Sequence, residues 1–463
     1  MKDEKIVLQM VEHHKKNGEI GITWWQLSLI GIGSIVGAGF FLGTSIAIGL
    51  TGPSVIIAFL IAGLIGYITF SALAEMKIND PETGSFRDYV RKAFGNNIAF
   101  ISGWMFWTAG VLIMASEVTA LSEFSRYWFP QIPLYVFSII YSFLGLGINL
   151  LGVKDFGKIE AFFAIVKITT LVLFIIFGVL FILGYVLPKG GVAGTPFISL
   201  SSLNWFPKGI KGLWSSIIFA LFPFAGVVVV GAASNQLKKK ESILKAINVL
   251  NLALVFLYVT SLFMILKMVH WQQIQVNKSP FVTALSVFNI PFINSIFNIV
   301  IISAAFSTFV GALFAITNVL LSLAKDHEAP QIVMRKNKRG VNVIALLLGT
   351  SFLLVTILLS FILPGTIYEY LTTAGSVLLI ANWIIILAAQ IKNRRNYPIQ
   401  SNTKIKPFKM LFAPYSSYLG IVLVIFALIG VVFNPIQRIG LFVSIGIVAI
   451  ITFAYSRIIV KSK

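Results

Sequence analysis

Clusters of glycine and proline interrupt two apolar stretches of the chain, and they are the places where the backbone becomes free to bind a ligand. The first cluster consists of Gly31, Gly33, Gly37 and Gly39, and the second is the sequence FPFAG at 222–226. Proline removes a backbone donor and clashes with the preceding turn, and glycine weakens a helix interior by about 1 kcal/mol. Each cluster therefore predicts a local break in a helix.

A helix break exposes the groups that a zwitterion needs. Unpaired N–H groups at the start of a half-helix, with the positive end of its dipole, hold a carboxylate, and unpaired carbonyls hold an ammonium. In lipid such groups are tolerated only where protein, water or a ligand satisfies them. Two broken spans in corresponding positions of two halves indicate a transporter site. The other interpretation is that the glycines only let helices pack closely.

Lys167 is the one basic residue that lies deep inside a predicted membrane span rather than near its end. A charge at that depth costs about 2.5–3.5 kcal/mol on insertion scales, which makes the residue a functional candidate. Three interpretations stay open. Lys167 loads and releases a proton during a transport cycle, or it is a permanent charge that ties helices together, or its side chain reaches out to the membrane surface.

Glu117 lies midway along another predicted span, between Ser116 and Thr119. Its carboxyl group contacts the far end of a substrate, or serves as a proton site, or is a protonated structural acid bonded to a neighbouring helix. Glu75 and Lys77, at the end of a span, are interpreted as interfacial charges.

The composition places these residues in a membrane protein. Of 463 residues, 57% are hydrophobic and 11% are charged, with a mean hydropathy of +0.92. A soluble domain carries roughly 25% charged residues, and a bilayer core needs about 20 apolar residues per helix. The expected fold is an all-α polytopic protein with twelve transmembrane helices. The predicted spans are 22–50, 54–76, 98–128, 133–150, 158–185, 209–237, 243–268, 295–325, 341–362, 366–392, 411–433 and 438–458.

The formal net charge of +20 follows these spans. With a cytoplasmic N-terminus, 28 of the 36 Lys and Arg residues lie on the cytoplasmic side and seven on the outer side. This asymmetry predicts topology through the positive-inside rule rather than nucleic-acid binding. The tails 1–21 and 459–463 are therefore expected in the cytoplasm. No apolar signal peptide precedes Trp24.

Spans one and six correspond if the first ten spans form a 5+5 inverted repeat. The transporter core is then 22–392, with repeats 22–185 and 209–392, and the helices of 411–458 lie outside it. Because five spans is an odd number, the second repeat inserts with opposite orientation.

Several other classes of protein are disfavoured by the sequence. The four histidines lie in predicted tails or loops, no span carries a metal-binding histidine pair or a GxSxG motif, and no GKS/T phosphate loop occurs. No short filter motif repeats as in a channel. We therefore expect no enzyme activity, metal or cofactor. A membrane sensor that binds amino acids without transporting them remains open.

The sequence resembles bacterial amino acid permeases of the amino acid–polyamine–organocation superfamily over nearly its whole length. VGAGFF at 36–41 with Gly52-Pro53 resembles the family pattern IGTG-[IL]-F…GP. PETGSF at 81–86, followed by Tyr89, Gly95, Gly103-Trp104 and Trp107, is similar to PxxGSFxxY…G…GWxYW and is the most specific match. The stretch from Ala304 to Gly340 resembles AxxS…LxxLAkdGxAP…rG.

The resemblance implies a leucine-transporter-like fold in which helices 1 and 6 are broken and hold the substrate. The binding residues it implies are Ile35, Val36, Gly37, Ala38 and Gly39 in the first break and Phe222, Pro223, Phe224, Gly226 and Val227 in the second. It also implies that Lys167 reaches carbonyls near Ile35 or Gly37 in place of a sodium ion, with Ser307 as a neighbour. Lys167, Ser307 and Glu117 are thus candidates for ion or proton coupling.

The expected function is uptake of small or neutral amino acids across the cell membrane, by proton-coupled symport with alternating access. The alternatives are an amino acid exchanger and the non-transporting sensor. Relatives often carry acids where this chain has Val228 and Gln236, so a coupling role for those acids is absent here. The expected partners are the amino acid, protons and the lipid bilayer, with the chain a monomer or weak oligomer.

Overall fold

The computed structural model describes residues 22–80, 85–151, 153–188, 204–224, 226, 237–362, 366–396 and 408–462. Over these residues the secondary structure is helical, apart from turns and one isolated bridge between Ile22 and Leu237. The predicted Val227, Val228 and Gln236 lie outside the described residues.

Eight described helical segments are long and apolar enough to cross a membrane. They are Ala38–Asn79, Asn96–Ser125, Phe162–Ile182, Ile243–Met268, Ile293–Lys325, Ile367–Arg395, Tyr415–Phe433 and Pro435–Arg457. Three shorter apolar helices accompany them, at Leu134–Leu150, Gly209–Phe224 and Val343–Leu358. The chain is therefore a polytopic membrane protein, as its hydropathy predicts.

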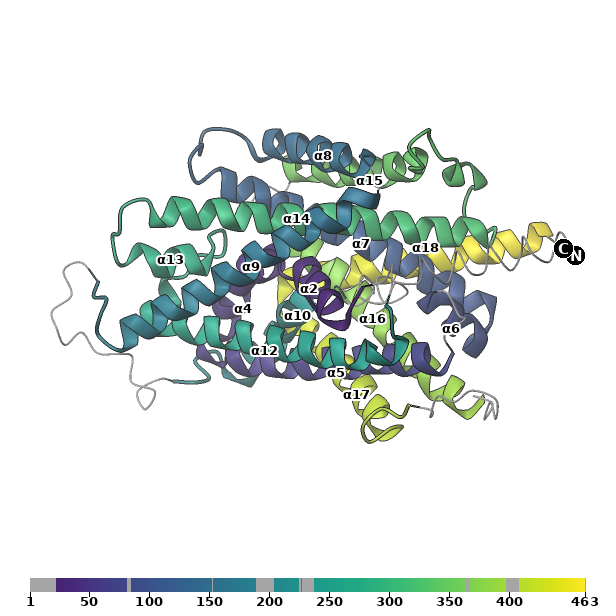
Figure 1. Cartoon of the computed structure of the whole chain (residues 1–463), viewed down its shortest axis with the longest axis horizontal. Coiled ribbons are helices and arrows are strands. Elements are labelled where there is room, and N and C mark those ends of the chain that lie inside the picture. Colours follow the sequence, from purple (N-terminus) through teal and green to yellow (C-terminus); the bar gives the residue numbers. More distant parts are fainter. Residues whose placement is uncertain are drawn as a thin grey trace, which may run out of the picture.

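The helices run mostly along the long axis of the molecule, and several short ones lie near its middle (Figure 1). The N-terminal helices are α2 (Trp24–Ile35), α3 (Ala38–Phe41), α4 (Gly43–Thr51), α5 (Val55–Asn79), α6 (Phe86–Phe94), α7 (Asn96–Ser125), α8 (Leu134–Leu150) and α9 (Val153–Ile182). The remaining helices are α10 (Gly209–Leu221), η2 (Phe222–Phe224), α12 (Ile243–Met268), α13 (Pro280–Ser286), α14 (Ile293–Lys325), α15 (Val343–Ile362), α16 (Ile367–Asn396), α17 (Tyr415–Gly430) and α18 (Pro435–Ser462).

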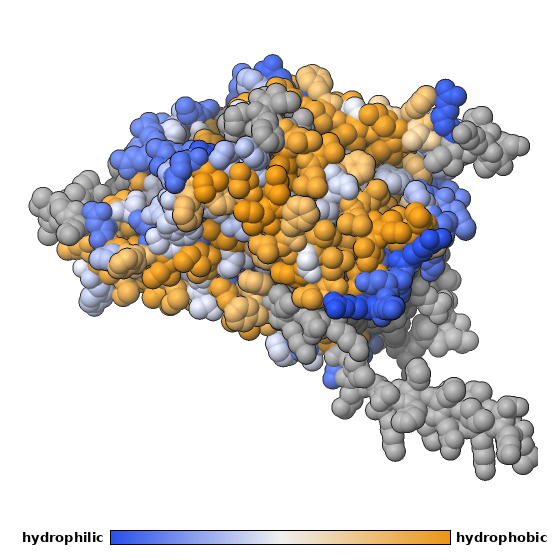
Figure 2. Space-filling view, turned by 90° about the horizontal axis from the view of Figure 1, so that it is seen from above, coloured by the Kyte–Doolittle hydropathy of each residue, from blue (hydrophilic) through white to orange (hydrophobic). Residues whose placement is uncertain are grey.

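The surface carries the apolar side chains that a soluble protein would bury. Figure 2 shows a broad hydrophobic middle, with hydrophilic patches gathered toward both ends of the long axis. Large apolar side chains that are exposed include Leu173, Phe256 and Phe442. A continuous apolar surface of this extent matches the hydrocarbon core of a bilayer whose normal follows the long axis.

Two packed groups of helices meet around the short central segments. On one side, α7 packs against α14 and α16. On the other, α5 packs against α10 and α12, and α2 packs against α9 and α12. The helix breaks belong to the second group and contact α7, α14 and α16 of the first, so each group forms one wall of any site at the breaks.

Candidate functional site

The first apolar helix is interrupted at Val36 and Gly37. Helix α2 ends at Ile35, Val36 is extended with φ −75° and ψ 106°, and Gly37 is extended with φ −150° and ψ −155° before α3 begins at Ala38. A Cβ atom on Gly37 would lie 2.5 Å from Oγ1 of Thr308. Glycine is therefore required because the side chain of Thr308, from α14, packs directly on the backbone.

The carbonyl groups that the break releases are taken up by polar side chains. Lys167, fully buried in α9, donates a hydrogen bond to the carbonyl of Gly33 and lies 3.0 Å from Oγ1 of Thr308. The same hydroxyl lies 3.1 Å from the carbonyl oxygen of Val36. The ammonium group thus stands at the negative end of α2, where a cation is favoured.

The N–H groups on the other side of the break bond to Glu117 of α7. Its carboxyl oxygens accept hydrogen bonds from the N–H of Ala38 at 2.9 Å and from that of Gly39 at 3.4 Å. The hydroxyl of Tyr368, from α16, donates to the carbonyl of Ala38 at 3.2 Å. The first break is therefore stabilised from both sides: Lys167 bonds to a carbonyl group before it, and Glu117 bonds to the N–H groups after it.

The second interruption follows α10, which ends at Leu221 and continues as the 3₁₀ turn η2. The two breaks touch at two points. The ring of Phe222 lies 2.6 Å from the position that a Cβ atom on Gly39 would take. The side chain of Ile35 lies 2.4 Å from the corresponding position on Gly226. Side chains larger than hydrogen at either glycine would push the breaks apart.

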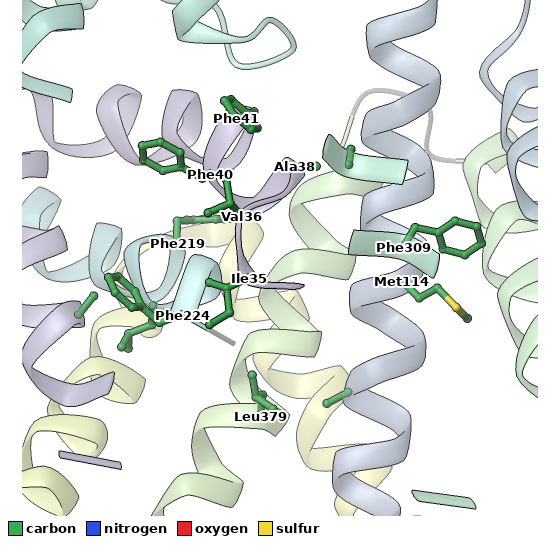
Figure 3. Close-up of a cluster of buried hydrophobic side chains, with 14 of the residues drawn as sticks. Ile35, Val36, Ala38, Phe40, Phe41, Met114, Phe219, Phe224, Phe309 and Leu379 are labelled. Carbon is green, nitrogen blue, oxygen red and sulfur yellow. The ribbon is translucent and has the colours of Figure 1, made fainter. Parts of the chain in front are cut away.

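A cavity of about 70 Å³ lies at these contacts. It is mostly apolar and is lined by Ser34, Ile35, Gly39, Phe106, Gly110, Ile113, Glu117, Phe222, Pro223, Gly226, Thr308, Ala312, Ala315, Ile316 and Leu379. Because the α7 residues run from Glu117 back to Phe106, the cavity extends from the breaks toward the beginning of α7. In Figure 3, Ile35 and Leu379 lie on the opposite side of Val36 from Phe40 and Phe41.

Packed rings fill the space on the Phe40 side of Val36. This aromatic cluster consists of Phe40, Phe41, Phe59, Phe174, Tyr258, Phe281 and Phe297, all buried. Phe40 stacks on Tyr258 with ring centroids 3.9 Å apart, and Phe281 stacks on Phe297 at 5.8 Å. The cluster lies toward the beginning of α14, so the cavity is closed at that end.

The structure brings most of the predicted site residues to one place, in different roles. Ile35, Gly39, Phe222, Pro223, Gly226 and Glu117 line the cavity, and Val36, Gly37 and Ala38 form the break behind it. Phe224 instead packs near Gly66 and edge-on to Tyr258 at 5.4 Å. Ser307 is buried in α14 beside Thr308.

Two further residues belong to this site that the sequence did not single out. Thr308 contacts both Lys167 and the first break, and Tyr368 contacts Ala38 from α16. The sequence places a hydroxyl at both 307 and 308, and hydropathy does not say which positions of α14 face Lys167. Nothing near Tyr368 in the sequence marks it as a site residue.

Comparison with known proteins gives a consistent assignment. The sequence model of the family described as "Amino acid permease" matches residues 26–462. The uncharacterized transporter YcgH of Bacillus subtilis (strain 168) is 38% identical, over 97% of this chain and 98% of the relative. The amino-acid permease AapA of the same organism is 31% identical over 92% and 91%.

The aromatic amino acid transport protein AroP of Escherichia coli (strain K12) is 29% identical over 93% of both chains. The match to the family model runs through both helix breaks, the cavity walls and the terminal helices α17 and α18. The expected family resemblance is confirmed, and this polytopic membrane protein belongs to the amino acid permease family of transporters.

Proposed function

We propose that the chain is a secondary active transporter of small or neutral amino acids. The observation that carries the proposal is the apolar cavity at two opposed helix breaks, close to backbone N–H and carbonyl groups that make no bond within a helix. Such groups bind the carboxylate and ammonium of an amino acid without charged side chains. The lining by Gly110, Ile113, Ala312 and Ile316 suits an aliphatic side chain rather than a charged one.

Glu117 has a part in this proposal because it holds the N–H groups that a substrate carboxylate would use. Its bond to Ala38, at 2.9 Å, is shorter than its bond to Gly39, at 3.4 Å. We infer that the carboxylate of the substrate takes over the N–H of Gly39 while Glu117 keeps that of Ala38. The carboxyl group would then hold the break open between turnovers.

The architecture that we propose has twelve spans and a 5+5 inverted repeat. Helices α2 to α9 form the first unit and α10 to α16 the second, with α17 and α18 outside. Support comes from the positions of the two breaks, since each falls in the first helix of its unit. Alternating access would then open the cavity first to one side of the membrane and next to the other.

We propose that the chain lies in the cell membrane with both termini and α6 on the cytoplasmic side, as a monomer or weak oligomer. The support is the distribution of Lys and Arg along the sequence, of which 28 fall on that side. In this orientation the cavity extends from the breaks toward the cytoplasm, and the aromatic cluster closes the outer side.

The function is tested first by a thermal-shift screen of the purified protein with the twenty amino acids, because a ligand of the native state raises the apparent stability. Uptake of the stabilising amino acid into proteoliposomes follows. Accumulation driven by a proton gradient supports symport, and accumulation only against a preloaded amino acid supports exchange. Binding without any movement of label across the membrane would make the protein a sensor and refute transport.

The site itself is tested by Gly37→Leu. The new side chain would collide with Thr308, so the break is forced open and the amino acid that stabilises the wild type no longer produces a thermal shift. Gly147→Leu is the matched control, because Gly147 of α8 is exposed and has open space around its Cβ position. Normal ligand binding by a folded Gly37→Leu protein would contradict the site.

Proton coupling through Lys167 is tested by Lys167→Ala. The substitution removes the cation from the carbonyl of Gly33 and from Thr308, and we expect uptake to lose its dependence on external pH. Initial uptake rates across a pH series, with a fixed membrane potential, measure this. An unchanged pH profile would leave Lys167 only its structural bonds at the break.

A further inference from the structure

A second cluster of charges lies outside the cavity, at the beginning of α7 and the end of α14. Arg87 of α6 is fully buried, and its guanidinium lies 3.1 Å from Asp326 and 2.9 Å from the hydroxyl of Ser322 while also pairing with Glu328. Arg91, one turn later, lies 2.7 Å from Asp326 and 3.2 Å from Glu328. We call Arg87, Arg91, Asp326 and Glu328 the ion-pair clamp.

The surrounding backbone is arranged to receive this clamp. A Cβ atom on Gly103 of α7 would lie 2.5 Å from Nε of Arg87, so the arginine crosses α7 at a glycine. The chain turns sharply after α14 at His327, with φ 59°, and the N–H of Glu328 donates to the carbonyl of Leu323 at 2.8 Å. Both carboxylates are thereby directed at α6.

The clamp continues directly into the wall of the substrate cavity. Phe86, which precedes Arg87, packs on Phe106 of α7 with ring centroids 5.3 Å apart. Phe106 lines the cavity at the end nearest α6. The position of α6 therefore fixes the position of the ring that limits the cavity on this side.

The attachment of α6 to the preceding helix is weaker. Lys92 pairs with Asp80 at 2.5 Å, but the lysine side chain is 55% exposed, and the hydroxyl of Tyr89 donates to the carbonyl of Asp80 at 2.8 Å. An exposed lysine pair contributes little because water and salt screen it, whereas separating buried arginine–carboxylate pairs is costly. By these contacts, α6 is thus joined more firmly to the α7–α14 wall than to α5. It also packs on α16, where the side-chain amide of Asn393 donates to the carbonyl of Tyr89 at 2.9 Å.

We propose that the ion-pair clamp is a permanent joint that keeps α6 on α7 and α14 throughout the transport cycle, rather than a gate that opens and closes. The inference rests on the proposed transport function. Phe106 then stays fixed, and the substrate enters and leaves this end by movement of the opposite wall, which carries Ile35 and Phe222 and packs with α5. Helices α5 and α6 then move relative to each other.

The experiment uses pairs of introduced cysteines. Because the chain contains no cysteine of its own, the reagent can react only with the introduced pair. The pair Arg91→Cys with Asp326→Cys joins α6 to α14 through a short bis-methanethiosulfonate reagent, while Arg87 and Glu328 remain. The matched pair Lys92→Cys with Asp80→Cys joins α6 to α5 with the same reagent. Each single variant, treated alike, controls for modification without cross-linking.

We expect uptake into proteoliposomes to be unchanged when α6 is linked to α14 and to fall at least several-fold when α6 is linked to α5, with recovery on reduction. Loss of uptake in the α6–α14 pair, restored by a reducing agent, would identify a gate and overturn the proposal.

Wild-type vesicles are measured in parallel, so that a wild type without uptake counts against the transport function and not against the joint. The rate of cross-linking gives a readout that needs no transport. For the α6–α14 pair it should be the same with and without the amino acid that stabilises the protein, and a rate that changes with ligand would contradict a permanent joint.

Discussion

Two clusters of opposite chemistry lie beyond the two ends of the cavity. At one end the aromatic cluster stacks rings such as Phe40 and Tyr258, whose centroids lie 3.9 Å apart. At the other, the ion-pair clamp ties α6 to the end of α14 through Arg87 and its two carboxylates. Ring contacts are weakly directional and re-form in several geometries, whereas arginine–carboxylate pairs hold only one. In the proposed cycle the rings therefore repack, while the clamp keeps α6 on α7 and α14.

The central pair of the ion-pair clamp, Arg87 with Glu328, is formed against the cost of burial. Burial lowers the pKa of Arg87, although the charges of Glu328 and Asp326 act to raise it. Burial likewise raises the pKa of Glu328, although Arg87 and Arg91 act to lower it. Pairing therefore does not fully offset the removal of these groups from water. Its contribution is the fixed geometry of α6, which a purely apolar contact would not give.

The largest expected effect is that of Arg87→Met at the clamp. The substitution leaves Asp326 and Glu328 without their buried partner, and we expect the protein to lose about 3–5 kcal/mol of stability. Thermal unfolding in detergent measures the loss. The double variant Arg87→Met with Glu328→Met should regain a large part of it, and a double variant as unstable as the single one would contradict the pairing.

A smaller effect is expected from Gly103→Ala, which displaces the clamp without removing a charge. The new methyl group would meet Arg87 and Leu323, and overpacking of this kind costs about 1–3 kcal/mol. Gly311→Ala in α14, where nothing lies within 4 Å of the Cβ position, is the control and should be neutral or stabilising. Equal unfolding temperatures for the two variants would show that Arg87 has room to move.

The smallest effect is expected from Phe40→Leu in the aromatic cluster. The substitution removes the stacked pair with Tyr258 but keeps an apolar side chain, so we expect a loss of about 0.5–1.5 kcal/mol. Thermal unfolding again measures it, with Phe453→Leu on the exposed face of α18 as the control. A loss as large as that of Arg87→Met would mean that both ends are equally rigid and would remove the contrast between them.

Much of the fold could be predicted from the sequence, because each apolar helix satisfies its own backbone and therefore shows as a local run of apolar residues. The predicted spans 98–128 and 243–268 agree closely with α7 and α12. Helix α6 was not foreseen as a structural element, since its nine residues carry five polar or charged side chains and resemble an ordinary basic loop.

The positions of the candidate site could be predicted from the sequence, but the contacts between its side chains could not. Gly37 marked the first break because glycine acts on its own backbone, and Lys167 stood out because a charge inside a span is costly. Two bonds of Lys167 go to the carbonyl of Gly33, two residues before the expected Ile35, and to Thr308, which adjoins the expected Ser307. The pairing of Glu117 with Ala38 and Gly39 depends on the rotation of α7, which hydropathy does not specify.

The sequence by itself determined the apolar helices, the charge asymmetry between their ends and the positions where glycine and proline weaken them, because all three are properties of neighbouring residues. Only the tertiary structure decided which side chains satisfy the broken helix and where the cavity lies. It alone joined Arg87 to Glu328, which are 241 positions apart. Contacts at that separation depend on how the helices pack, and no local pattern records them.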